Sequence, residues 1–106
     1  MARYLLKVSY TQAGAQGVMK EGGSSRRDMV AKLLVDAGGT LETFDFAFGE
    51  NDVYTTVDLP DHATAAALSM TVAGTGAATV QTVVLLSPEE IDKASGRSIA
   101  YRAPGK

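Results

Sequence analysis

Apolar and polar positions alternate in three stretches of the chain, a pattern typical of β-strands with one buried face. A fourth stretch ends in a β-branched and aliphatic run of strand length, which also predicts a strand. The stretches cover residues 3–10, 40–48, 53–58 and 78–86. A turn-forming tetrapeptide at 49–52 separates the second strand from the third, so we predict that these two strands form a hairpin. In the first strand the side chains predicted to face the core are Tyr4, Leu6, Val8 and Tyr10.

Helices are predicted between and after these strands, because each segment combines good helix formers with a residue that caps helices. The predicted segments are about 11–20, 26–37, 60–72 and 87–94, and their caps are Thr11, Ser24 or Ser25, Asp61 and Ser87. Residues 96–106 show no periodicity. We therefore expect one domain over 1–95 and a loosely ordered C-terminal tail over 96–106.

The order β-α-β-β-α-β predicts an α+β, ferredoxin-like fold with a four-stranded antiparallel sheet and the helices on one face. We expect the first strand to lie at the centre, parallel to the third. The other face of the sheet is then uncovered, with Arg3 and Lys7 near Asp52 and Asp58. The same face is expected to carry an apolar group consisting of Leu5, Leu41, Tyr54 and Val83 or Leu85. A mixed apolar surface of this kind usually meets another subunit or a ligand, so self-association is the leading expectation.

Composition narrows the function classes. The chain has 106 residues, a net charge of −2, one histidine and no cysteine. One small domain is expected, and cysteine nucleophiles and thiolate or His-rich metal sites are excluded, so no metal or other cofactor is predicted. The near-neutral charge favours no nucleic-acid partner. No apolar run is long enough for a membrane span or a signal peptide, so we expect a cytoplasmic protein without a membrane partner.

Three segments carry a family likeness. The segments KEGGSSRRDMV at 20–30, FDFAFGENDVY at 44–54 and VDLPDHATAAALSMTVAGTG at 57–76 resemble the GYD domain family, and the resemblance covers roughly residues 3–92. It implies a fold similar to the dimeric α/β barrels, in which two ferredoxin-like units pack sheet against sheet, and it implies no assigned biochemical role. The family pattern commonly has an aromatic residue before the hairpin Asp, where this chain has Asn51.

The segment from Gly22 to Arg27 is a candidate anion site. A glycine-rich entry to a helix exposes backbone N–H groups, and the side chains of Ser24, Ser25, Arg26 and Arg27 could complete the site. Its spacing matches neither a phosphate-binding loop nor a dinucleotide fingerprint. We favour the alternative of a flexible loop with a serine cap and two solvated arginines.

Three residues are weak candidates for catalysis, namely Asp52, Tyr54 and His62. Asp52, beside Tyr54 at the hairpin and near Tyr4 or Tyr10, could act as a general base, although a turn-stabilising role is favoured. His62 could act as an acid or a base, but its place in the first turn of a helix favours a solvated side chain.

Phe44, Phe46 and Phe48 all point one way in the predicted second strand. With Tyr10 they could line a ligand pocket between sheet and helices, although filling the core is the favoured role.

Three functions from different classes follow, in this order of preference. The first is a self-associating domain that forms a homodimer or a higher homo-oligomer through its open sheet face. The second is a cofactor-free enzyme or a small-molecule binder that uses the pocket under the phenylalanines. The third is an anion or nucleotide sensor at the Gly22–Arg27 helix start. The sequence leaves open whether the protein is an enzyme at all.

Overall fold

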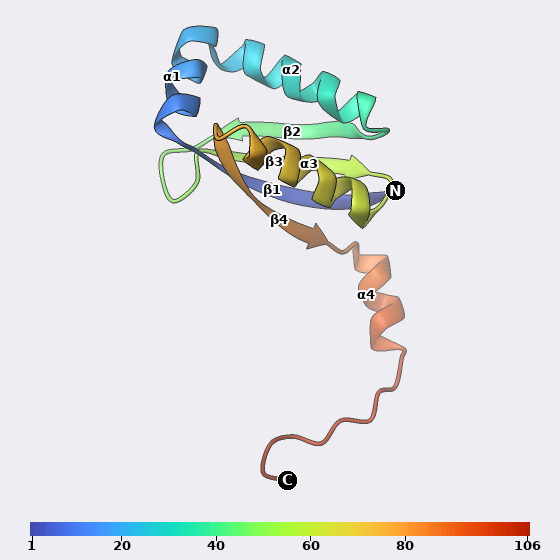
Figure 1. Cartoon of the computed structure of the whole chain (residues 1–106). Helices are drawn as coiled ribbons and strands as arrows, with labels where there is room; N and C mark the ends of the chain where they lie inside the picture. Colours follow the sequence, from blue (N-terminus) through green and yellow to red (C-terminus); the bar gives the residue numbers. More distant parts are fainter.

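The computed structural model describes all 106 residues. It confirms the predicted α+β fold: a four-stranded antiparallel sheet with helices packed on one face (Figure 1). Four strands and four helices follow one another as β1 (Ala2–Tyr10), α1 (Gln12–Glu21), α2 (Gly23–Asp36), β2 (Thr40–Phe46), β3 (Val53–Leu59), α3 (His62–Gly74), β4 (Ala78–Leu85) and α4 (Pro88–Ser95).

The strand order is β2-β3-β1-β4, and β1 pairs antiparallel with both of its neighbours. The expectation that the first and third strands run parallel is therefore wrong. The helical connection makes β1 and β2 parallel, and β3 returns by the hairpin to lie between them in the opposite direction (Figure 1). Arg3 pairs with Asp58 as expected, whereas Lys7 lies opposite Tyr54 rather than beside Asp52.

The core lies between the sheet and helices α2 and α3. Its buried residues are Tyr4, Leu6, Leu34, Val57, Leu59 and Ala65. Tyr4 and Leu6 come from the central strand β1, and Leu34 comes from α2. The apolar face of the strand and the apolar face of the helix therefore pack in one cluster. Only 11 of the 106 residues are buried. Such a small core leaves much apolar surface for a partner to cover.

The phenylalanine stripe is only partly buried, which corrects the expectation that all three rings fill the core. Phe44 is half-buried, and its ring packs edge-to-face against Phe46 with centroids 5.4 Å apart. Phe46 is 45% exposed and Phe48 is fully exposed. The strand ends at Phe46, so the alternation that would have turned Phe48 inward stops two residues before it.

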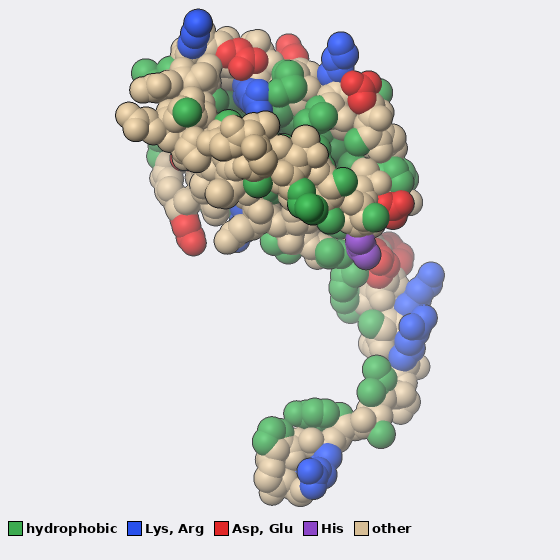
Figure 2. Space-filling view, viewed as in Figure 1, with side chains coloured by type: hydrophobic (Ala, Val, Ile, Leu, Met, Phe, Trp, Pro, Cys, Tyr) green, Lys and Arg blue, Asp and Glu red, His purple; other side chains and the backbone are tan.

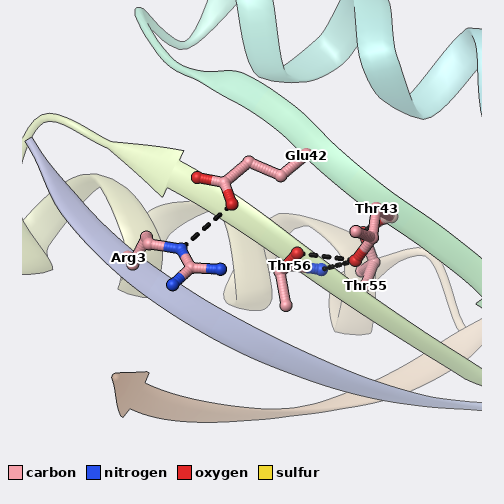
Figure 3. Close-up of polar contacts among 5 residues, drawn as sticks. All are labelled: Arg3, Glu42, Thr43, Thr55 and Thr56. Atoms are coloured by element: carbon pink, nitrogen blue, oxygen red, sulfur yellow. Dashed lines mark hydrogen bonds and ion pairs between the residues drawn. The ribbon is translucent and has the colours of Figure 1, made fainter. Parts of the chain in front are cut away.

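A β-bulge at Glu42 changes which residues of β2 face the helices. Leu41 pairs with Val57 but Thr43 pairs with Thr56, so Glu42 is an extra residue in the ladder (Figure 3). Leu41 therefore packs on the core. Its predicted place on the uncovered face is wrong, because simple alternation ignores the extra residue.

Three of the predicted helix caps are present. Thr11, Asp61 and Ser87 accept backbone hydrogen bonds at the starts of α1, α3 and α4. The cap of α2 differs from the prediction: Gly22, with φ of 93°, precedes the helix and no side chain caps it. Ser25 lies inside the first turn and donates to Glu21 Oε1 at 3.2 Å.

The C-terminal segment extends away from the body of the domain, as Figure 1 shows. The radius of gyration is 16.9 Å, whereas a compact chain of this length has about 13 Å. The chain exposes 7317 Å², about 1,600 Å² more than a folded monomer of its mass usually exposes. The isolated chain thus has surface to spare for a partner.

The first prediction tests which apolar side chains hold the fold. Leu34→Ala removes a fully buried side chain, so it should lower the free energy of unfolding by roughly 2–5 kcal/mol. Phe48→Ala removes a fully exposed ring and should change it by less than about 0.5 kcal/mol. Denaturant unfolding of both variants at equal protein concentration measures the difference. Equal losses would show that the core is wrongly placed.

Candidate functional site

Tyr10, at the end of β1, lies at the centre of the candidate binding site. An open groove of about 400 Å³ lies where α1 and the start of α2 face the β2–β3 turn. Its lining includes Tyr10, Val18, Phe46, Phe48 and Asp52. This volume falls within the range of small-molecule sites. The structure thus brings Tyr10 together with two of the three predicted phenylalanines.

Phe44 lines a different space. Beneath it, between the sheet and helices α2 and α3, is an internal cavity of about 60 Å³ with mainly apolar walls. A volume of this size accommodates water-sized molecules only. The predicted pocket between sheet and helices is therefore small, and the larger space lies outside it, between Phe46 and Phe48. Tyr10 lines both spaces.

Asp52 is held by backbone groups at the mouth of the groove. Its Oδ2 accepts a hydrogen bond from the Tyr10 amide at 2.8 Å. Its own amide donates to the Val8 carbonyl at 2.8 Å, and its carbonyl accepts from the Ala47 amide at 2.9 Å. These bonds fasten the hairpin turn to the end of β1. Asp52 thus has the turn-stabilising role that its residue type favours, with its carboxylate also at the groove.

The Tyr10 phenol has Arg26 as its charged neighbour. Burial raises the pKa of Tyr10 above its ordinary value, and Arg26 opposes the rise through a side-chain hydrogen bond and its positive charge. Nearby Asp52 and Glu21 add smaller increases to the same pKa. Sequence reasoning missed this contact, because β1 and α2 are distant in the chain. An arginine at the predicted start of a helix that packs on the sheet was the available signal.

The candidate anion segment does not converge on one point. Ser25 donates to Glu21, and Arg27 pairs with the adjacent Asp28 at 3.1 Å. Arg26 instead turns toward Tyr10. Ser24 and Arg27 lie with Phe44 and Phe46 along a separate shallow depression. The four residues therefore do not form an assembled anion site, since two of them already have partners within the chain.

His62 lies at the other end of β1 from Asp52. Its Nδ1 is 2.6 Å from the hydroxyl of buried Tyr4, and the two rings meet edge to face. Six residues of strand separate Tyr4 from Tyr10, which is about 20 Å at the usual rise. Although His62 is exposed as predicted, it is too far from Asp52 to form an acid–base pair with it.

Tyr54 faces the uncovered side of the sheet, away from the Tyr10 groove. Buried Asn51 holds it there: Asn51 Nδ2 donates to the Tyr54 hydroxyl at 3.3 Å, and Asn51 Oδ1 accepts from Ser9 Oγ at 3.1 Å. Asn51 thus ties the hairpin to β1 at the position where the resemblance anticipates an aromatic residue. The side chains of Asp52 and Tyr54 therefore lie on opposite faces of the sheet.

The uncovered sheet face has an apolar half and a polar half. The strand register places Leu5 beside Val83, and Leu85 opposite Arg3 on the same face. Tyr54 lies across from Lys7 on the neighbouring strand. Toward β2 the face becomes polar, with Thr43 and Thr56 joined through their hydroxyls at 2.6 Å. The expected group of Leu5, Tyr54, Val83 and Leu85 is present, without Leu41.

The bulge residue Glu42 adds a charged cluster to the polar half. Its Oε2 accepts a hydrogen bond from Arg3 Nε at 3.0 Å, across the intervening strand β3 (Figure 3). A hydrogen bond with Asp58 is the main cause that raises the pKa of Glu42, and Arg3 opposes the rise. Arg3 thus offsets one of the two carboxyl groups, and the cluster carries one negative charge when both carboxyl groups are ionised.

These features define a ferredoxin-like domain with one open sheet face and a groove beside Tyr10. Residues 4–95 match the model of the GYD domain. The chain therefore belongs to the GYD domain family, which confirms the family resemblance. No curated protein and no solved structure matches the chain.

Two further structural findings concern membranes and metals. No helix has both the length and the apolar character that crossing a bilayer requires. No three His, Asp or Glu side chains gather as a set of metal ligands. The cytoplasmic location stays a prediction.

The second prediction tests the contact between Arg26 and Tyr10. Arg26→Gln removes the charge that opposes the raised pKa of Tyr10, so this pKa should rise further. Arg27→Gln is the matched control, because Arg27 pairs with Asp28 and should leave Tyr10 unchanged. The titration is followed by NMR of ¹³C-labelled tyrosine rings. Equal effects of the two substitutions would contradict the assigned contact.

Proposed function

We propose that this GYD domain is a self-associating module whose open sheet face packs against the same face of another copy, in a homodimer or a higher homo-oligomer. The observation that carries the proposal is the apolar half of this face. Leu5, Val83 and Leu85 lie together there, and helices of the same chain cover only the opposite face. Packing this half against a second copy removes apolar side chains from water.

The surface area supports the same proposal. A stable interface usually buries about 800 Å² on each partner. The exposed area of the chain exceeds that of a typical monomer of 11.1 kDa by about 1,600 Å². Part of this excess belongs to the extended C-terminal arm (Figure 1), so the area supports contacts through the arm as well as through the open face.

The distribution of charge suits a symmetric contact. In an isologous dimer each copy presents the same patch, so the patch must complement itself. Arg3 already pairs with Glu42 within one chain, and Asp58 adds a second carboxyl group beside them. The open face also carries Lys7 opposite Tyr54, so charges of both signs lie on the patch and can pair across a two-fold axis.

The third prediction tests this face. Val83→Lys places a charge in the apolar half, and because Val83 is 38% exposed the long side chain reaches water in a monomer. Val35→Lys is the matched control on exposed α2. We expect the wild type and the control to associate at about 50 μM, and Val83→Lys to have a lower average mass, closer to 11.1 kDa, by light scattering.

Two outcomes would contradict the proposal. A wild-type chain that stays at 11.1 kDa would show that the face is not a self-association surface. A Val83→Lys variant that associates as strongly as Val35→Lys would show that copies meet through another surface. Circular dichroism of both variants checks that each is folded.

A second candidate function is small-molecule binding in the Tyr10 groove. The specific observation that favours it is the combination of two aromatic rings, Phe46 and Phe48, with the Asp52 carboxylate around a space of ligand size. An apolar ligand with one hydrogen-bonding group fits this lining. A bound ligand would shift the titration of Tyr10 described above. Anion sensing at Gly22–Arg27 has less support, because Ser25 and Arg27 have partners in the chain.

A further inference from the structure

Helix α3 has a mainly apolar outer face, on which His62 and Thr71 are the exposed polar residues. Its sequence contains no Lys, Arg, Asp or Glu, and its exposed side includes Ala63, Ala66, Ala67, Met70 and Ala73. In Figure 2 the surface over α3 carries hydrophobic side chains and none of the charged colours. A helix without charged residues and with apolar side chains on its outer as well as its inner side is typical of a buried position. The isolated chain leaves this helix uncovered.

A groove runs along α3 beside the edge strand β4. Its space is about 360 Å³, and its lining includes Ala65, Ala66, Met70 and Val84. Met70 is 74% exposed and Val84 is 50% exposed. The hydrogen-bonded pair of Tyr4 and His62 closes one end. The groove is therefore an apolar surface on the side of the molecule away from the Tyr10 groove and separate from the open sheet face.

The C-terminal arm, residues 86–106, is the one long segment that extends away from the sheet and its packed helices (Figure 1). The backbone and side-chain hydrogen bonds of residues 87–106 stay within the arm. A complete capping box at Ser87 and Glu90 starts α4 two residues after β4 ends, which directs the helix away from the body (Figure 1). The arm nevertheless carries large exposed apolar side chains: Leu86, Ile91, Ile99 and Tyr101.

We propose that α4 of one copy docks in the α3–β4 groove of another copy, with Ile91 as its apolar anchor. The occupant follows from the geometry, because the capped α4 points away from its own groove and its apolar side chains need a surface in a neighbouring molecule. The inference rests on the proposed self-association and adds a second contact to it. The excess exposed area noted above leaves room for both contacts.

The chemistry of the two surfaces agrees. On α4, Pro88, Ile91 and Ala94 form one stripe at helical spacing, while Glu89 and Lys93 lie on the opposite side. The alanines of α3 allow a close approach of the second helix, because the distance between packed helices depends on the side chains at the contact. Since α3 carries no charge, docking the apolar stripe buries no unpaired charge on that helix.

The test uses the absence of cysteine from the chain, which makes single-cysteine variants clean probes. An Ile91→Cys chain and a ¹⁵N-labelled Met70→Cys chain are mixed, equilibrated and treated with a short bis-maleimide. Mass spectrometry then counts covalent pairs that contain one chain of each mass. Lys93→Cys mixed with Met70→Cys is the matched control, because Lys93 lies on the other side of α4. All three positions are exposed, so the variants should fold.

We expect several-fold more mixed pairs with Ile91→Cys than with Lys93→Cys. Equal yields would overturn the docking of the Ile91 side. A chain that carries both Ile91→Cys and Met70→Cys and crosslinks only within itself would show that the arm folds onto its own α3, which would also overturn the proposal.

The experiments distinguish a wrong docking proposal from a wrong self-association proposal. If only the arm proposal is wrong, light scattering still gives an oligomer that Val83→Lys dissociates, but no Ile91-specific mixed pairs form. If self-association itself is wrong, the wild-type mass is that of a monomer and no mixed pairs form with any variant.

Discussion

The sheet has two faces, and helices of the same chain cover one of them. Strand residues on the covered face meet residues from the helices and form the core, which consists of Tyr4, Leu6, Val57, Leu59, Leu34 and Ala65. Side chains on the other face of the sheet, such as Leu5 on β1 and Val83 on β4, have no such partner. This one-sided packing explains why so few residues are buried, and it is the physical reason to expect a second copy.

Alternation along the strands was enough to predict the sheet, the hairpin and most of the covered face, because the side-chain period of a strand is two. It failed at Leu41, since the extra residue Glu42 shifts the register of an edge strand and no sequence signal marked the bulge. It also failed at Phe48, because alternation has no meaning beyond the residue where pairing ends.

The candidate site was less predictable than the fold. Tyr10, Phe46, Phe48 and Asp52 do meet at one groove, but the contact of Tyr10 with Arg26 depends on how α2 lies over β1, which local patterns do not specify. Conversely, residues that are neighbours in sequence serve different faces: Asp52 fastens the Tyr10 end of β1, while Tyr54 belongs to the open face. Asp52 and Tyr54 are close in sequence, but the fold does not pair their side chains.

The most direct test of the central claim is to ask which methyl groups water reaches. Leucine and valine methyls are labelled, and a soluble paramagnetic agent is added to the wild-type chain at about 50 μM. If the open face is covered by a second copy, the methyl signals of Leu5, Val83 and Leu85 are protected like those of buried Leu34, while those of exposed Val35 are broadened. Broadening of the Leu5 and Val83 signals to the extent seen for Val35 would contradict the account.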